Sequence, residues 1–150
     1  MSAPAPTACP CGQCDARGQT LQFTACCGRY LDHDDTPAPD AERLMRSRYS
    51  AFVLGRLAYL RASWHPSTRP TDLTLEPGVK WLGLDVRQHR TIDADHAEVE
   101  FVARSRDPGG RGQRLHERSR FVREGGRWFY VDGDVRGADR LTAALNTSRS

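Results

Sequence analysis

The stretch RLHERSRFVREGGRWFYVDGD, residues 114–134, decides the fold. Two runs that carry aromatic and β-branched residues flank the pair Gly125-Gly126. A Gly-Gly pair in this setting predicts a β-hairpin with a two-residue turn, because both central positions of a type I′ turn need positive φ. We therefore expect two antiparallel strands, over residues 113–124 and 127–134.

The two-residue turn also fixes which residues face each other. Side chains of one strand alternate between the two faces of a sheet, so residues paired at every second position share a face. We expect that face to be aromatic near the turn and acidic further along. The predicted pairs are Arg123–Trp128, Phe121–Tyr130, Ser119–Asp132 and Glu117–Asp134.

The residues before the hairpin complete an α+β fold. Residues 79–91 and 97–106 show the same partial two-residue alternation and predict two more strands. Upstream, Asp40 is a typical N-cap and Gly55 a typical stop for a first helix. A second, short helix follows and stops before Pro66. Two helices followed by a four-stranded antiparallel meander form an α+β domain.

Composition is that of an ordinary folded chain. The 150 residues are 38% hydrophobic and carry a net charge of +3, which argues against disorder throughout the chain. No run approaches the length of apolar residues that a membrane span needs, so we expect no membrane partner. All but Lys80 of the 22 basic residues are arginine, which a GC-rich genome explains without a nucleic-acid partner. The first residues lack the features of a signal peptide, so we expect a cytoplasmic protein.

The five cysteines all lie between residues 9 and 27. Thiolates from two short knuckles are typical zinc ligands, and Cys9, Cys11, Cys26 and Cys27 make the best set of four. Cys14 is the spare thiol, and it can replace Cys11. A disulfide between Cys26 and Cys27, free structural thiols and redox chemistry are the alternatives. With four thiolates and no open position, the predicted site is structural rather than catalytic.

The string Cys-Pro-Cys-Gly … Cys-Cys-Gly resembles the SEC-C motif, the zinc module of the bacterial preprotein-translocase motor ATPase. This resemblance implies Zn²⁺ on the same four cysteines. The chain departs from the motif in a longer interval between Cys11 and Cys26, and in Cys14, where the motif has a small residue.

Further strings resemble the YchJ family of small bacterial proteins. Its main domain is similar to the nuclear-transport-factor-2-like (NTF2-like) cone, also seen in SnoaL-like cyclases, in which a curved antiparallel sheet wraps over N-terminal helices. The strings are LMRSRYSAFVLG (44–55), WHPSTRP (64–70), WLGL (81–84), VEFVARSR (99–106) and the hairpin stretch 114–134.

The compositional break after the last cysteine, read with these resemblances, divides the chain into five parts. We expect a disordered lead (1–8), a SEC-C-like zinc module (9–30, the cysteine module), a linker (31–39), an NTF2-like domain (40–136, the cone domain) and a C-terminal tail (137–150).

Three carboxylates are the first candidates for chemistry. Glu117, Asp132 and Asp134 share one face in the predicted register, and carboxylates held close in a partly dry pocket suit acid–base work. The alternative is that they form salt bridges with neighbouring arginines. His65 is either a pocket base or a histidine that faces the last carbonyls of the second helix. Trp64, beside it, is expected to be buried.

Arginines give two further interpretations. Arg46 and Arg48 lie on the first helix, where we expect them to cover its solvent face rather than bind an anion. A later run of arginines, interrupted by acidic residues, could meet RNA phosphates. Its members are Arg104, Arg106, Arg111, Arg114, Arg118, Arg120, Arg123 and Arg127.

Taken together, the sequence favours a binding or adaptor protein. The zinc module would dock a protein or ribosomal partner, while the cone would hold a small molecule or a peptide. An enzyme that uses the pocket carboxylates is the alternative function, and an arginine-rich RNA binder is the third.

Overall fold

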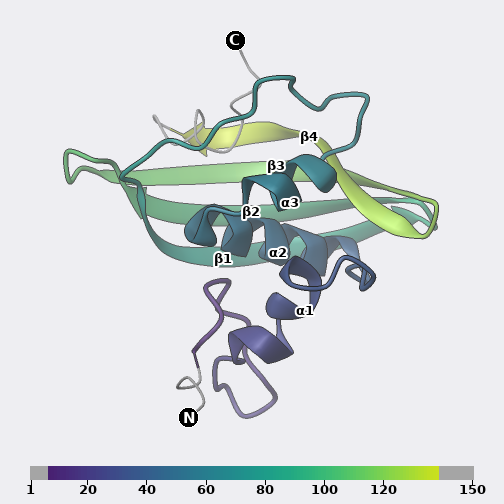
Figure 1. Ribbon diagram of the computed structural model, residues 1–150, viewed down its shortest axis with the longest axis horizontal. Coiled ribbons are helices and arrows are strands. Elements are labelled where there is room, and N and C mark those ends of the chain that lie inside the picture. The colour runs from purple at the N-terminus through teal and green to yellow at the C-terminus, as the bar shows by residue number, and fades with distance from the viewer. Residues whose placement is uncertain (1–6, 139–150) are drawn as a thin grey trace.

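The computed structural model describes residues 7–138, and within them helices cover one face of an antiparallel sheet (Figure 1). The strands follow the chain in the order β1-β2-β3-β4, so the sheet is a meander, and the α+β prediction is confirmed. The elements are η1 (Phe23–Ala25), α1 (Gly28–Leu31), α2 (Ala41–Leu54), α3 (Leu57–Ala62), β1 (Lys80–Asp93), β2 (His96–Arg106), β3 (Gly112–Glu124) and β4 (Arg127–Ala138).

Helix α2 begins and ends where its sequence signals predict. The Asp40 carboxylate accepts a hydrogen bond from the backbone N–H of Arg43 at 2.8 Å, which satisfies a free donor of the first turn. At the other end Gly55 has φ 71°, a left-handed conformation that glycine adopts without a steric penalty. Both signals are local, so the sequence alone reveals them.

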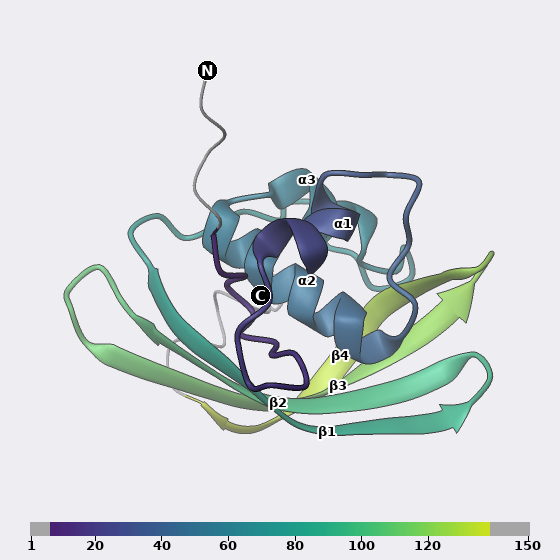
Figure 2. The ribbon, with the colours of Figure 1, turned by 90° about the horizontal axis from the view of Figure 1, so that it is seen from below.

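The sheet curves around the helices, as Figure 2 shows from below. On β2 the inner face is formed by alternate residues, among them Val99 and Phe101, which are buried against the helices. The buried side chains form one cluster that runs from the four cysteines of the cysteine module to Tyr130 on β4. The cysteine module and the cone domain therefore share a core.

The hairpin turn is confirmed, but the register beyond it is not. Gly125 and Gly126 have φ of 58° and 81°, and Arg123–Trp128 and Phe121–Tyr130 pair as predicted. An extra residue, Val131, then bulges out of β4. After the bulge, the observed pairs are Arg120–Asp132, Ser119–Gly133, Arg118–Asp134 and Glu117–Val135.

This bulge overturns the predicted pairs Ser119–Asp132 and Glu117–Asp134. A slip of one residue moves side chains to the opposite face, so the aspartates leave the inner face on which Glu117 lies. The segment after α3 runs beside β4 at this point: His65 donates its backbone N–H to the Tyr130 carbonyl at 2.8 Å, and the Thr68 hydroxyl donates to the Val131 carbonyl at 2.6 Å. These contacts between residues far apart in the chain hold the bulge in place, and no local sequence pattern predicts them.

Trp64 closes the domain between the end of α3 and β4. It is 2% exposed, as predicted, and its ring meets that of Tyr130 edge-on with 5.0 Å between the centroids. Of the predicted lead and tail, residues 1–6 and 139–150 lie outside the described residues, whereas Thr7 already accepts a hydrogen bond from the Phe23 N–H. None of the helices within residues 7–138 is long and apolar enough to cross a membrane.

Candidate metal centre and binding groove

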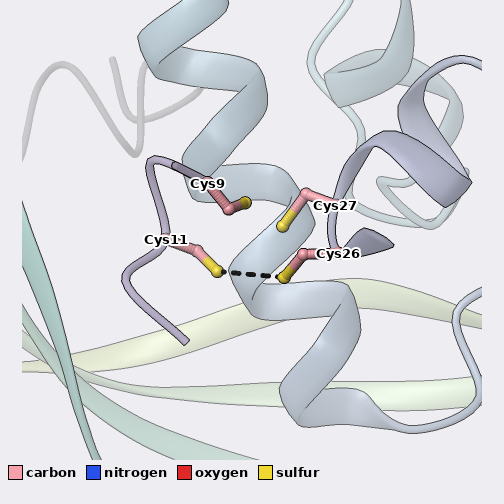
Figure 3. A group of neighbouring side chains, drawn as sticks. All are labelled: Cys9, Cys11, Cys26 and Cys27. Carbon is pink, nitrogen blue, oxygen red and sulfur yellow. Dashed lines mark hydrogen bonds between the residues drawn. The ribbon is translucent and has the colours of Figure 1, made fainter. Parts of the chain in front are cut away.

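Four cysteines converge from two segments of the cysteine module. The sulfur atoms of Cys9, Cys11, Cys26 and Cys27 all lie within 4.8 Å of one another, and all four residues are buried (Figure 3). The Cys11 and Cys26 sulfurs are 3.6 Å apart. A tetrahedral thiolate site with metal–sulfur bonds of about 2.3 Å separates its sulfurs by roughly 3.8 Å. The spacing therefore fits a four-coordinate metal ion.

Glycines shape both knuckles. Gly12 has φ 76° and donates its N–H to the Cys9 carbonyl at 3.1 Å, which folds the first knuckle back on itself. Gly28 follows the second knuckle, and a Cβ there would lie 2.7 Å from the Phe23 carbonyl oxygen. A larger residue would push α1, and with it Cys27, away from the other sulfurs.

The thiols perturb one another's ionisation. Hydrogen bonds from the neighbouring thiols, that of Cys11 first, lower the pKa of Cys9, and the hydrogen bond with Cys26 lowers the pKa of Cys11 to about 7. The same contacts, chiefly with Cys11, raise the pKa values of Cys26 and Cys27 above the ordinary value of 9.0. At this spacing the four thiols oppose one another's ionisation, and a metal ion between them would offset that repulsion and allow all four to bind as thiolates.

Cys14 lies outside this group. Its thiol is exposed and donates to the Gly12 carbonyl at 3.5 Å, on a short bridge between Cys14 and Thr20. All five cysteines are free thiols, so the structure contains no bond between Cys26 and Cys27.

Arg46 ties the metal centre to α2. Its guanidinium donates to the Cys11 carbonyl at 3.1 Å and pairs with Glu42 at 2.9 Å. The Cys9 sulfur also lies 3.6 Å from the Ser50 hydroxyl on the same helix. The expectation that Arg46 covers a solvent face is wrong, because the cysteine module packs on that side of α2.

Arg48 is also not a solvent-face residue. It is 4% exposed, and it donates to the Leu60 carbonyl at 2.9 Å and to the Ser63 hydroxyl at 2.7 Å. Its guanidinium lies over the rings of Trp64 and Tyr130, 5.2 and 4.7 Å from their centroids. Burial lowers the pKa of Arg48 to about 10, so it stays charged at neutral pH.

Glu117 lies in the same buried region on the inner face of β3. It is 2% exposed, and its carboxylate accepts hydrogen bonds from Ser119 at 2.7 Å and from Tyr130 at 3.3 Å. Gly133 faces it from β4, where a Cβ would collide with the carboxylate. This carboxylate is held in a packed polar cluster, and its nearby charged group is Arg48.

Asp132 and Asp134 lie on the outer face of the sheet. Both pair with Arg120, at 2.6 and 2.9 Å, and the hydrogen bond from Arg120 lowers the pKa of Asp134. The structure therefore separates the two aspartates from Glu117, and the predicted group of three carboxylates does not form. The alternative interpretation, a salt bridge to a neighbouring arginine, describes both aspartates.

His65 contacts the end of β3 rather than the carbonyls of α3. Its Nδ1 accepts the Ser67 backbone N–H at 3.1 Å, which leaves Nε2 to donate to the Glu124 carboxylate at 2.9 Å. The ring also meets Phe129 edge-on, at 5.8 Å between centroids. Both ring nitrogens thus have partners inside the chain.

Ion pairs engage part of the arginine run. Three of its members form ion pairs: Arg118 with Glu100, Arg120 with the two aspartates and Arg123 with Asp95. Arg104 and Arg114, which face each other across β2 and β3, form no ion pair within residues 7–138. RNA binding stays a prediction.

A groove of about 770 Å³ lies between the cysteine module, the linker, α3 and the start of β4. Two contacts hold the linker against the cone domain: Arg56 pairs with Asp32 at 2.9 Å, and Arg127 donates to the Asp34 carbonyl at 2.6 Å. The sequence does not reveal this groove, because its walls meet only in the folded chain. Its main apolar lining is Tyr30, Leu31, Leu57, Tyr59, Trp128 and Phe129.

Comparison with known proteins identifies the family. The family model described as the YchJ middle NTF2-like domain matches residues 40–133. UPF0225 proteins of Polaromonas sp. strain JS666 and Methylibium petroleiphilum are 66% and 58% identical to this chain, over 85% and 87% of it and 93% and 90% of their own lengths. The solution structure of RPA3114, a SEC-C motif containing protein from Rhodopseudomonas palustris, matches with a TM-score of 0.72 at 33% identity, over 87% of this chain and 100% of that one. The chain therefore belongs to the YchJ-like UPF0225 family.

Proposed function

We propose that this protein is a zinc-containing adaptor, and that the groove between its cysteine module and its cone domain holds an apolar segment of a protein partner. The groove carries the proposal. Tyr30 of the cysteine module, Leu57 of α3 and Phe129 of β4 meet there from distant parts of the sequence. An apolar hollow rimmed by polar residues is typical of a binding surface.

The groove suits a short segment rather than a whole domain. A volume of about 770 Å³ is within the range of sites for small ligands, so it takes a few side chains of the partner. Arg127 sits at its rim with its charge free of an ion pair within residues 7–138. We therefore expect bound segments to combine aromatic or aliphatic residues with a nearby acidic one; ribosomal proteins and free proteins are both possible sources.

Zinc has a structural role in this proposal. Thiolate ligands, buried sulfurs and a closed tetrahedral arrangement are typical of structural zinc. The metal would hold the two knuckles together. It would thereby also hold α1, which follows the second knuckle and forms one wall of the groove. It would not meet the partner directly.

Elemental analysis of protein purified without a chelator tests the metal. We expect one zinc per chain in the wild type and in Cys14→Ser, and a loss of zinc in Cys26→Ser. Wild-type protein without zinc, or equal loss in both variants, would contradict the assignment.

Peptide selection tests the groove. A displayed library of random peptides is selected on the wild-type protein, and the Kd of the winning peptides is measured by fluorescence anisotropy. Ala58 is exposed and lines the groove, so Ala58→Arg should block it without disturbing the core. Ala94, exposed in the turn between β1 and β2, provides the matched control Ala94→Arg.

We expect Ala58→Arg to weaken binding at least about tenfold, roughly 1.4 kcal/mol, and Ala94→Arg to leave the Kd unchanged. Selection of no peptide, or of peptides whose Kd is the same for both variants, would overturn the groove as the binding site.

A further inference from the structure

A second cavity, of about 320 Å³, lies at the other end of the sheet from the groove. It sits beside the turn between β2 and β3, where the loop that precedes β1 also passes (Figure 1). We call it the end cavity. Its lining includes Glu76, Ser105, Asp107, Pro108, Arg111 and Gln113.

Two buried polar atoms of residues that line the end cavity lack hydrogen-bond partners. Ser105 on β2 is 0% exposed and Gln113 on β3 is 6% exposed, and the two residues face each other in the sheet register. Neither Ser105 Oγ nor Gln113 Oε1 has a hydrogen-bond partner anywhere in residues 7–138. Buried polar atoms in folded proteins are nearly always paired, so two such atoms in residues that line one cavity point to a group that binds there. Both atoms are buried in this structure, so binding requires the side chains around them to shift.

The orientation of the Gln113 amide follows from its neighbour. Gln113 Nε2 donates to Asp107 Oδ2 at 3.2 Å. A carboxylate only accepts hydrogen bonds, so the amide nitrogen must face it and the amide oxygen must be the atom left without a donor. Asp107 is itself held by the Arg111 backbone N–H at 2.9 Å, a hydrogen bond that lowers the pKa of its carboxyl.

The free groups define what the end cavity recognises. Gln113 Oε1 accepts only, and Ser105 Oγ can accept, so a complementary ligand must donate hydrogen bonds. The Glu76 and Asp107 carboxylates in the lining also favour a donor, while Arg111 offers the one cationic group of the lining. The volume is roughly ten times the 30 Å³ that one water molecule occupies in the liquid, which leaves room for a small organic molecule.

We propose that the end cavity binds a small amine or amide that donates hydrogen bonds to Gln113 Oε1 and Ser105 Oγ. The shared chemistry is an N–H donor, whether it belongs to a charged ammonium group or to a neutral amide. This site is separate from the groove and from the metal centre, so its failure would leave the proposed adaptor function standing.

Three small probes test the ligand class. Methylammonium carries a charged donor, acetamide a neutral donor, and acetate no donor. Each is titrated into ¹⁵N-labelled protein while the side-chain Nε2 signals of Gln113 are followed by NMR. We expect saturable shifts with methylammonium, acetamide or both, and none with acetate. Tighter binding of methylammonium would indicate that the natural ligand carries an ammonium group, and tighter binding of acetamide would indicate a neutral amide.

A pair of serine variants separates a ligand site from a packing feature. Ser105→Ala removes a hydroxyl without a partner, so it should raise the unfolding midpoint of the free protein and weaken probe binding at least tenfold. Ser119 is equally buried, on the inner face of β3, but its hydroxyl donates to Glu117. Ser119→Ala should therefore lower the midpoint and leave probe binding unchanged.

Gln113→Met, which keeps the length of the side chain but not its amide, gives a second test if Ser105→Ala has only a small effect. It should abolish the shifts that both donor probes cause in the backbone amide signals of Ser105 and Asp107, which remain observable in this variant. No saturable shift with either donor, equal shifts with acetate, or unchanged probe affinity in both Ser105→Ala and Gln113→Met would overturn the proposal.

Discussion

Arg48 is a buried charge whose contacts stabilise the core. Its guanidinium has two hydrogen-bond acceptors and two aromatic rings around it, and only a planar, forked cation matches all four. Lysine offers a point charge on a flexible stem. We expect Arg48→Lys to lower the free energy of unfolding by about 2–4 kcal/mol, measured by urea denaturation.

Arg43 on the same helix is the matched control for that substitution. It pairs with Asp40 at the surface, with 39% of its side chain exposed. We expect Arg43→Lys to change stability by less than about 0.5 kcal/mol. Equal effects of the two substitutions would mean that the contacts of Arg48 with the rings and with Ser63 contribute little.

Gly133 is a second residue whose role depends on a distant partner. A Cβ at this position would collide with the Glu117 carboxylate and lie 2.9 Å from the Arg118 carbonyl oxygen. We expect Gly133→Ala to destabilise the protein by about 1–3 kcal/mol, as overpacking does. Gly112, at the start of β3, has open space around its Cβ position, so Gly112→Ala should be close to neutral. Thermal melts of the two variants and the wild type measure both effects. A neutral Gly133→Ala would show that β4 can shift away from Glu117.

Among the elements, those with local signals could be predicted from the sequence and those set by distant contacts could not. The Asp40 cap, the Gly55 stop and the Gly125-Gly126 turn each act within a few residues, and the structure places all three as expected. The bulge at Val131 depends on a segment more than sixty residues earlier in the chain, to which Thr68 belongs.

The candidate sites divide in the same way. The clustering of the cysteines is visible in the sequence because the four residues form two short knuckles. The group of three carboxylates rested on the hairpin register, and one bulged residue was enough to send Asp132 and Asp134 to the other face. The groove had no sequence signal, since Tyr30 and Phe129 meet only after folding.

The outer face of the sheet carries a pH-dependent contribution to stability. His116 on β3 lies 2.7 Å from Glu100 on β2, and their hydrogen bond lowers the pKa of Glu100 below its ordinary value of 4.5. A carboxyl whose pKa is lower in the folded state stabilises the protein above its unfolded-state pKa, and this stabilisation is lost as the pH falls through the folded-state value.

We therefore expect Glu100→Gln to lose less stability than the wild type when the pH falls below about 5. Urea midpoints measured from pH 7 to pH 3 check this. Glu98→Gln is the control, because Glu98 lies on the same strand and forms no ion pair within the described part of the chain. Parallel curves for the wild type and Glu100→Gln would show that the pair with His116 does not contribute.

At the scale of the whole molecule, the cysteine module and the cone domain are joined by a continuous core. Arg46 bonds the carbonyl of Cys11, Ser50 lies beside the sulfur of Cys9, and both belong to α2. A neighbouring side of α2 contacts the sheet, where Tyr49 meets Trp81 edge-on at 5.6 Å. A change at the metal centre is therefore expected to reach the sheet through one helix.

Removal of the metal tests this coupling. An ion that binds only the folded state stabilises every element that unfolds together with its site. All three tryptophans lie in the cone domain, so their fluorescence reports the unfolding of that domain and not of the cysteine module itself. We expect a chelator, or Cys26→Ser, to lower the urea midpoint seen by tryptophan fluorescence, and Cys14→Ser to leave it unchanged. If far-ultraviolet circular dichroism showed a loss of structure on chelation while the tryptophan midpoint stayed constant, the two parts would fold independently. The cysteine module, and with it one wall of the groove, could then unfold while the cone domain stays folded.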